Sequence, residues 1–251
     1  MAHFYLDDSL AAQLHETGRD IGAVVRLRGQ DARHAVTVAR VRLGERLRFG
    51  DGAGLVVHGT VSSAEPGEVA LEVERVERVE RPAPRIHLVQ ALAKGDRDEL
   101  AVQAATELGV DVVVPWQAAR SVSRWDAAKA AKGRERWAVI AREASKQSMR
   151  AWLPEVEPIA TTRQLVDRAQ NATVLVLDPE GDVSLSQLTA AEFGDRDIVL
   201  VVGPEGGIAD EEFAAFAAAG ARRVRLGATV LRTSTAGPAA IAVLSAALGR
   251  W

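Results

Sequence analysis

Residues 199–213, VLVVGPEGGIADEEF, indicate the fold of this chain more directly than any other stretch. An apolar run followed by a turn and an acid-rich helix start is typical of a buried parallel strand. A plain connection between a strand and a helix does not need the three glycines of Gly203-Pro204-Glu205-Gly206-Gly207. Because glycines let a ligand approach the backbone closely, the segment predicts an α/β fold with a binding site at this turn.

The first 80 residues have a different pattern. Short segments of alternating polarity, separated by Gly and Asp-Gly turns, predict a small β-barrel or sandwich, interrupted by one helix over 31–41. The segment RPAP at 81–84 then predicts a stiff connector and a domain boundary. We therefore expect a small domain at 1–80 and a larger one at 81–251.

From residue 85 onward, predicted strands alternate with predicted helices. The strands are expected at 85–92, 111–116, 173–178, 197–203 and 222–227, and the helices at 96–109, 133–149, 209–220 and 235–251. This alternation predicts a parallel sheet covered by helices on both faces.

The composition excludes several classes of protein. With 251 residues, 47% hydrophobic and 26% charged, the chain resembles an ordinary globular protein. It contains no cysteine, and its five histidines lack metal-ligand spacing, so we expect neither disulfides nor a metal site. No apolar run approaches the ~18–20 residues of a membrane span, and an acidic N-terminus argues against export. We expect a cytoplasmic protein.

Arginine is concentrated in two parts of the chain, although the net charge is −3. Residues 26–48 contain seven arginines and two acids, and residues 120–150 contain nine basic residues and three acids. A solvated surface would explain such clusters. An extended polyanion as partner is the alternative, because arginine binds phosphate well.

Three junctions between a strand and a loop are candidates for the binding site: residues 175–181, 201–207 and 224–237. Open α/β sheets bind ligands at the carboxyl ends of their strands. The dinucleotide fingerprint G-x-G-x-x-G and the phosphate loop G-x-x-x-x-G-K-[ST] are both absent from the sequence. A ligand held mainly by backbone groups is therefore expected, rather than a nicotinamide dinucleotide or ATP.

The final predicted helix is apolar on all sides and rich in alanine. A helix of this kind is buried. It either belongs to the core of its own domain or forms a dimer interface, and both are compatible with its composition.

Four segments, in this order, resemble the family of bacterial 16S ribosomal RNA uracil-N3-methyltransferases, ribosomal RNA small subunit methyltransferase E, of the knotted SPOUT class. They are KGDRDELAVQAATELGVDVVVPWQAARSV (94–122), RWAVIAREASKQSMRAWLPEV (136–156), VGPEGGIADEEF (202–213) and LGATVLRTSTA (226–236). RGQDARHAVTVARVRLGERLRFGDG (28–52) is similar to the family's PUA-like RNA-binding domain.

The resemblance implies a PUA-like RNA-binding β-barrel at 1–80 and, at 81–251, a SPOUT methyltransferase domain with a C-terminal trefoil knot. It implies S-adenosylmethionine as the cofactor, a homodimer whose partner completes the site, and N3 of a uridine in 16S rRNA, within the 30S subunit, as the methyl acceptor. The residues implied to bind the cofactor are Leu177, Gly203, Glu205, Gly206, Gly207, Leu226, Gly227, Leu231 and Thr233. Two positions depart from the family pattern, in which Ser234 and Lys146 would both be Glu.

Methyl transfer requires alignment and a way to stabilise charge on the uracil when N3 loses its proton. Arg232 is the candidate to hold the uracil carbonyl or its phosphate; the alternative is an arginine that caps the preceding loop. Glu205 either accepts the proton or holds a loop by accepting backbone N–H bonds. Thr233, Ser234 and Thr235 are expected to cap the final helix. The sequence identifies no general base.

Eight arginines are candidates for contacts with RNA phosphates: Arg26, Arg28, Arg33, Arg40, Arg42, Arg120, Arg124 and Arg150. With only 4% aromatic residues, recognition of the RNA backbone and shape is expected, rather than base stacking. Two other functions remain open, namely a related enzyme that methylates a ribose 2′-hydroxyl or tRNA, and a non-catalytic RNA-binding factor.

Overall fold

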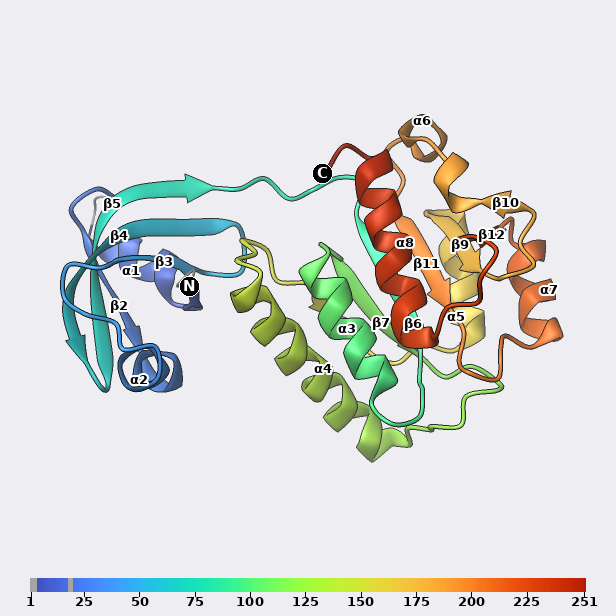
Figure 1. Ribbon diagram of the computed structural model, residues 1–251, viewed down its shortest axis with the longest axis horizontal. Helices are drawn as coiled ribbons and strands as arrows, with labels where there is room; N and C mark the ends of the chain where they lie inside the picture. The colour runs from blue at the N-terminus through green and yellow to red at the C-terminus, as the bar shows by residue number, and fades with distance from the viewer. Residues whose placement is uncertain (1–3, 18–19) are drawn as a thin grey trace. The chain divides into compact units, whose positions relative to one another are not determined.

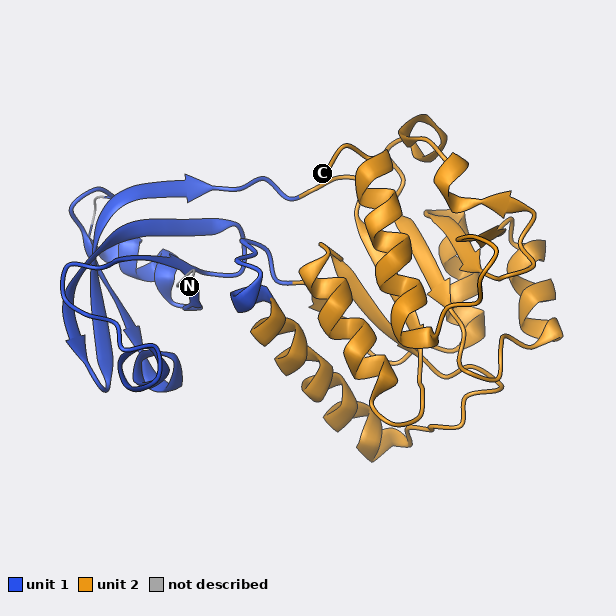
Figure 2. Ribbon diagram, viewed as in Figure 1, with its two compact units in different colours: residues 1–81, 145–153 blue, residues 82–144, 154–251 orange. Residues whose placement is uncertain are grey.

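The computed structural model describes residues 4–17 and 20–251, and the chain divides into two compact units (Figure 2). Unit 1 comprises residues 1–81 and 145–153, and unit 2 comprises residues 82–144 and 154–251. The segment 145–153 lies within the predicted second domain but belongs to unit 1 by its contacts. None of the helices in the described ranges combines the length and the apolar character that a membrane span requires.

In the described residues, unit 1 contains a five-stranded sheet of order β1-β3-β4-β5-β2, in which the β1–β3 pair is parallel and the other pairs are antiparallel. The strands are β1 (Phe4–Leu6), β2 (Val24–Arg28), β3 (Arg46–Gly50), β4 (Leu55–Glu65) and β5 (Glu68–Arg78). Alternation along β2 buries Val25 and Leu27 in the core and directs Arg26 and Arg28 away from it.

The expectation of a single helix in the first domain is wrong, because α1 (Leu10–Thr17) precedes α2 (Gly29–Thr37). Helix α1 buries Leu10 and Leu14, which lie one turn apart on the same face. Two apolar contacts in eight residues are too weak a periodic signal to predict such a helix from sequence.

Unit 2 contains, over the described residues, a seven-stranded parallel sheet of order β10-β12-β9-β11-β6-β7-β8 (Figure 1). The strands are β6 (Ile86–Ala91), β7 (Val112–Trp116), β8 (Glu155–Val156), β9 (Thr173–Leu177), β10 (Val183–Ser184), β11 (Ile198–Val202) and β12 (Arg222–Arg225). The predicted parallel sheet is confirmed; the two-residue strands β8 and β10 were not predicted, because they carry no periodic pattern.

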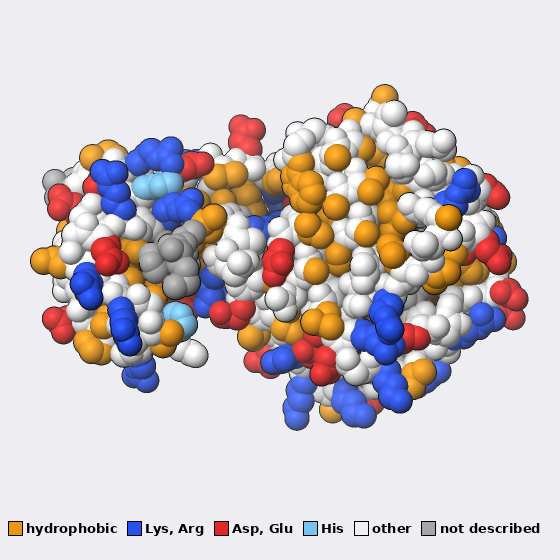
Figure 3. All heavy atoms as spheres, viewed as in Figure 1, with side chains coloured by type: hydrophobic (Ala, Val, Ile, Leu, Met, Phe, Trp, Pro, Cys, Tyr) orange, Lys and Arg blue, Asp and Glu red, His pale blue; other side chains and the backbone are white. Residues whose placement is uncertain are grey.

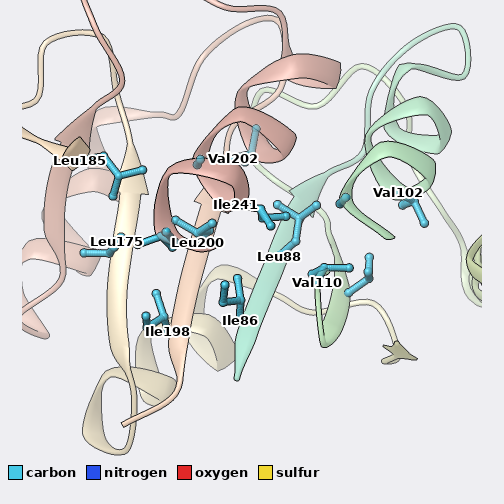
Figure 4. Packing of buried hydrophobic residues seen from close by; sticks show 14 of the residues in the cluster. Ile86, Leu88, Val102, Val110, Leu175, Leu185, Ile198, Leu200, Val202 and Ile241 are labelled. Carbon is cyan, nitrogen blue, oxygen red and sulfur yellow. The ribbon is translucent and has the colours of Figure 1, made fainter. Parts of the chain in front are cut away.

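Helices cover both faces of this sheet. One hydrophobic cluster joins Leu88 of β6 and Leu200 of β11 to Val102 and Ile241 (Figure 4), and it also contains Trp137. Val102, Trp137 and Ile241 come from α3 (Arg97–Glu107), α4 (Ala127–Gln147) and α8 (Thr233–Ala247). On the opposite face, a second cluster contains residues from α5 (Thr162–Asp167) and α7 (Asp210–Ala218). Short helical turns complete the unit, namely α6 (Ala190–Phe193), η1 (Arg168–Gln170) and η2 (Leu185–Gln187).

The connection from β12 to α8, residues 226–232, runs along the carboxyl ends of the strands, where the binding site was predicted. Strand β12 pairs with β9, whereas α8 packs on β11, β6 and α3. The connection therefore passes the carboxyl ends of β9 and β11. A threaded loop requires a crossing of this kind, and the trefoil knot itself stays a prediction.

Candidate functional site

The three predicted junctions lie together around one cavity of about 510 Å³. Its wall also contains Arg97 from α3 and Phe213 from α7. From the junctions it includes Leu177, Asp178, Pro179, Gly203, Pro204, Glu205, Gly207, Leu226, Gly227, Thr229, Val230, Leu231, Arg232 and Thr233, and Ile208 lies directly after the second junction. Cavities of this size are typical of small-molecule sites.

The turn after β11 shows why glycine occurs repeatedly there. A Cβ at Gly203 would lie 2.7 Å from Cγ1 of Ile208, and Gly207 adopts a φ of +74° in a turn closed by its N–H to the carbonyl of Pro204. Gly206 faces away from the lining residues, since its Cβ would lie 3.3 Å from the Cβ of Arg120. Close packing against Ile208 thus explains the glycine at 203, and the left-handed backbone conformation explains the glycine at 207.

Glu205 is tied to the loop that precedes α3. Its Oε1 accepts hydrogen bonds from the Lys94 N–H at 3.2 Å and from Nη1 of Arg97 at 3.1 Å. This geometry matches the loop-holding alternative for Glu205, because the carboxylate is already engaged by a cation and a backbone N–H.

A second carboxylate in the cavity wall, Asp178, was not singled out from the sequence. It is 8% exposed and pairs with the Arg223 guanidinium, whose Nε lies 2.6 Å from Oδ2. The same guanidinium lies over the Phe213 ring, 4.6 Å from its centroid. An acid directly after the apolar strand 173–177 is the signal that could have identified this residue.

The segment 92–98, which ends in the first turn of α3 and includes Arg97, is held by a buried acid. Asp98 accepts hydrogen bonds from the N–H groups of Ala93 and Glu99, at 3.0 and 2.9 Å. Burial raises the pKa of its carboxyl group, and the hydrogen bond from Ala93 opposes this shift.

The start of α8 differs from the expected cap. Arg232 occupies the N-cap position without a side-chain capping bond, and Thr233 is the first helical residue. The buried Thr233 hydroxyl instead donates to the Gly203 carbonyl at 2.9 Å. The prediction that Thr233, Ser234 and Thr235 cap this helix is therefore wrong. In the described part of the chain, no group pairs with the exposed Arg232 guanidinium, which lines the cavity.

The arginines predicted to contact RNA fall into different environments within unit 1. Arg26 and Arg28 share the Glu68 carboxylate, at 3.0 and 2.9 Å, and the Arg28 hydrogen bond is the main cause that lowers the pKa of Glu68. Over the described ranges, the exposed side chains of Arg33, Arg40 and Arg42 have no ion pair or hydrogen bond.

The remaining basic candidates lie in the segment 120–150. Arg120 donates to the Ile208 carbonyl at 3.2 Å, and Arg124 donates to the Ala119 carbonyl at 3.3 Å. The Arg150 N–H bonds to the Ser145 carbonyl at 2.9 Å within unit 1. Lys146, one of the two departures from the family pattern, forms an ion pair with Asp31 at 2.9 Å.

Fold and cavity together define a class, the RNA methyltransferases with a PUA domain. Residues 80–245 match the RNA methyltransferase domain family, and residues 27–74 match the RNA methyltransferase PUA domain family.

Whole-chain relatives identify the particular family. The chain is 44% identical to ribosomal RNA small subunit methyltransferase E of Mycobacterium bovis, over 94% of this chain and 91% of the relative. It is 31% identical to the Bacillus subtilis protein of that name, over 86% and 88%. The Neisseria gonorrhoeae enzyme of that name, solved with S-adenosylmethionine bound, is 30% identical with a TM-score of 0.79, over 98% and 97%. The chain belongs to the ribosomal RNA small subunit methyltransferase E family.

Proposed function

We propose that this protein methylates N3 of a specific uridine in 16S rRNA of the small ribosomal subunit, with S-adenosylmethionine as the methyl donor. The observation that carries the proposal is the cavity at the meeting point of three strand-to-loop junctions, in a chain of the ribosomal RNA small subunit methyltransferase E family. The S-adenosylmethionine bound to the Neisseria gonorrhoeae relative supports the choice of cofactor.

The residues of the cavity fit this cofactor. Gly227 lines the cavity, and a Cβ placed there would meet no protein atom within 4 Å, so the glycine leaves space open. Leu177, Leu226 and Leu231 would supply apolar contact to the adenine, with backbone groups of the loops as hydrogen-bond partners. Gly203, Glu205, Gly207 and Thr233 line the same space, and Gly206 would act by shaping the turn.

Bound in this cavity, the cofactor supplies an activated methyl group. The protein's contribution is alignment and charge stabilisation. The Arg232 guanidinium, which has no partner within the described ranges, would donate hydrogen bonds to the uracil carbonyl, where negative charge develops as N3 loses its proton. Glu205, which is engaged by Arg97 and the Lys94 N–H, would keep the glycine turn in place rather than take the proton.

For the RNA, we propose a PUA-like RNA-binding domain at 1–80 and the methyltransferase domain at 81–251. Arg33, Arg40 and Arg42 would contact phosphates directly, because their guanidinium groups are unpaired in the described residues. Further phosphate contacts would use guanidinium N–H donors that are not engaged by the present partners, in Arg26, Arg28, Arg120, Arg124 and Arg150.

We further propose a homodimer whose partner completes the site, as the resemblance implies. Hydrophobic side chains gather on the face of unit 2 over α8 (Figure 3). Val230, on the rim of the cavity, is 77% exposed, and Val243 of α8 is only partly buried. A cytoplasmic location, where ribosomal subunits are assembled, follows from the proposed substrate.

The test uses purified protein, methyl-tritiated S-adenosylmethionine and 30S subunits from a strain that lacks the activity. Label in 16S rRNA together with one new stop of reverse transcriptase supports the proposal, because an N3-methyl group blocks base pairing. Label without a stop indicates an acceptor atom that does not take part in base pairing, such as a ribose 2′-hydroxyl, and contradicts the N3 assignment. Cofactor binding without label on 30S subunits, free 16S rRNA or tRNA would favour a non-catalytic RNA-binding factor.

A further inference from the structure

Strand β6 contains two polar residues, His87 near its amino end and the fully buried Gln90 near its carboxyl end. The Nε2 of Gln90 donates to the Ala91 carbonyl at 3.1 Å and to Oγ1 of Thr233 at 2.8 Å. A buried amide is tolerated only when it is hydrogen-bonded. These two bonds use the N–H groups of the Gln90 amide, whereas its buried Oε1 has no hydrogen-bond partner in the described part of the chain.

Gln90, Thr233 and Gly203 are linked in a row by hydrogen bonds, and the Gly203 carbonyl determines which group donates in each bond. Because the Gly203 carbonyl can only accept, the Thr233 hydroxyl must give its proton to it, at 2.9 Å. Thr233 then offers a lone pair to the Gln90 amide. The opposite orientation of the amide would turn the Gln90 oxygen toward the Ala91 carbonyl, which is also an acceptor. The observed orientation satisfies all three acceptors.

This chain of bonds joins elements that are far apart in sequence. Gln90 and Thr233 are separated by 143 residues, and they connect the end of β6, the turn after β11 and the first residue of α8. One turn further along α8, a Cβ at Gly237 would lie 2.8 Å from Cδ1 of Leu88, so the helix already lies close to β6. Close packing and directional bonds thus act on the same end of the helix.

Two of the three bonded residues, Gly203 and Thr233, line the cavity, whereas Gln90 lies behind its wall. Leu231 and Arg232, which also line the cavity, immediately precede Thr233. We propose that Gln90 is a positioning residue for the cofactor site. By holding Thr233 against Gly203, it sets the distance between the turn after β11 and the segment 231–232. This proposal rests on the proposed function, because it concerns the same cavity.

The test compares Gln90→Met, which removes the amide donor at similar side-chain length, with the wild type. The dissociation constant of S-adenosylmethionine, from titration calorimetry, is expected to rise about ten-fold, the effect of one lost buried hydrogen bond. KM for the cofactor should rise while KM for the RNA is unchanged. The melting temperature of the cofactor-free protein should stay within about 3 °C, the shift that corresponds to ~1 kcal/mol in a chain of this size.

Thr233→Val breaks the same bond from the other side and answers the question if Gln90→Met does not fold. Thr233→Ser keeps the hydroxyl and is expected to restore the affinity lost in Thr233→Val. The matched control is Gln103→Met on α3, where the exposed amide bonds only to Glu107 among the described residues. It should bind the cofactor like the wild type.

The double variant of Gln90→Met and Thr233→Val should bind no more weakly than Thr233→Val alone, because Thr233→Val already removes the bond to Gln90 as well as the bond to Gly203. A lower melting temperature for Gln90→Met with an unchanged dissociation constant overturns the positioning role and leaves Gln90 as a core residue only. If the wild type itself does not bind S-adenosylmethionine, the proposed function fails first, and this outcome is distinguishable from the previous one.

Discussion

At the scale of single residues, two positions in the cavity wall are occupied by glycine for different physical reasons. A Cβ at Gly203 would lie 2.7 Å from Ile208, whereas a Cβ at Gly227 would meet nothing within 4 Å. Neither residue has a positive φ that would itself require glycine. Gly203 therefore permits close packing within the protein, and Gly227 keeps space free beside the loop 226–232.

Gly227→Val is expected to weaken binding of S-adenosylmethionine at least about ten-fold, because the side chain would occupy space that the cofactor needs. The unfolding free energy should stay within about 0.5 kcal/mol of the wild type. Gly203→Val should instead destabilise the fold by about 1–3 kcal/mol through overpacking. Calorimetric titration and urea unfolding on both variants check this contrast, and equal destabilisation by the two would contradict it.

Arg232 is expected to act on the rate of methyl transfer rather than on cofactor binding. Arg232→Ala should lower kcat about 10²–10³-fold, the usual effect of removing one donor to a developing oxyanion. The S-adenosylmethionine affinity should change less than about three-fold. Single-turnover rates with 30S subunits, together with cofactor titrations, separate the two effects. A normal kcat would leave Arg232 without the proposed catalytic role.

His87, the second residue of strand β6, makes stability depend on pH. Burial lowers the pKa of His87 in the folded protein, although its Nε2 lies 3.2 Å from the Asp197 carboxylate. As the pH falls below about 6.5, the unfolded chain binds a proton that the folded chain does not, so the unfolding free energy decreases, by at most about 1.4 kcal/mol per pH unit.

His87→Gln, which cannot titrate, should flatten this dependence between pH 7 and 5. Urea unfolding at several pH values measures the slope, and an equally steep slope in the variant would assign the effect to other groups. Asp197 acts at lower pH. Burial alone would raise its pKa, but hydrogen bonds from Arg85 outweigh this and lower it. The stability that Asp197 contributes is therefore present above about pH 3.9 and lost below it.

At the scale of elements, the end of α4 shows how one departure from the family pattern is accommodated. Lys146 forms an ion pair with Asp31 of α2, with side chains only 17% and 21% exposed. A glutamate at 146 would place two carboxylates together at this position. The lysine is thus explained by its local partner within unit 1.

Lys146→Glu is expected to destabilise the protein by about 1–2 kcal/mol, through lost attraction and new repulsion in a partly buried pair. Asp31→Lys combined with Lys146→Glu exchanges the charges and should recover most of this loss. Urea unfolding of the two single variants and the double variant gives the coupling energy. Additive losses would show that the pair contributes nothing specific.

At the scale of the whole molecule, binding of RNA should depend less on salt than the arginine count suggests. Glu68 already neutralises part of the charge of Arg26 and Arg28. If five phosphates were neutralised, log affinity would fall against log salt with a slope of roughly −3.5. Arg33, Arg40 and Arg42, which have no side-chain partner among the described residues, alone correspond to a slope of roughly −2.

Arg40→Ala should therefore reduce the slope for RNA binding by about 0.7, and Arg26→Ala should reduce it less, because Arg26 is already paired. Filter binding of a 16S rRNA fragment between 50 and 200 mM salt measures both effects. The Debye length is about 10 Å near the middle of this range. Equal effects of the two substitutions would show that the pairing with Glu68 does not persist on RNA.

Much of the architecture was predictable because its signals are local. The apolar runs at 173–177 and 198–202 and the acid-rich start of α7 are read from neighbouring residues, and the parallel sheet follows from their alternation with helices. The convergence of three junctions on one cavity also follows, because carboxyl ends of parallel strands share one edge. Elements with weak local periodicity, such as α1 and β8, were missed.

The sequence by itself determined the alternation of the main strands and helices after residue 85, the glycine-rich turn and the family. Only the tertiary structure decided which partner each charged or polar group has: Glu205 with Arg97, Asp178 with Arg223, Gln90 with Thr233, Lys146 with Asp31. The physical reason is the separation along the sequence over which each kind of interaction acts. Periodicity and turn chemistry act over a few residues, whereas these pairs join residues 45 to 143 positions apart and form only once the packed core brings them together.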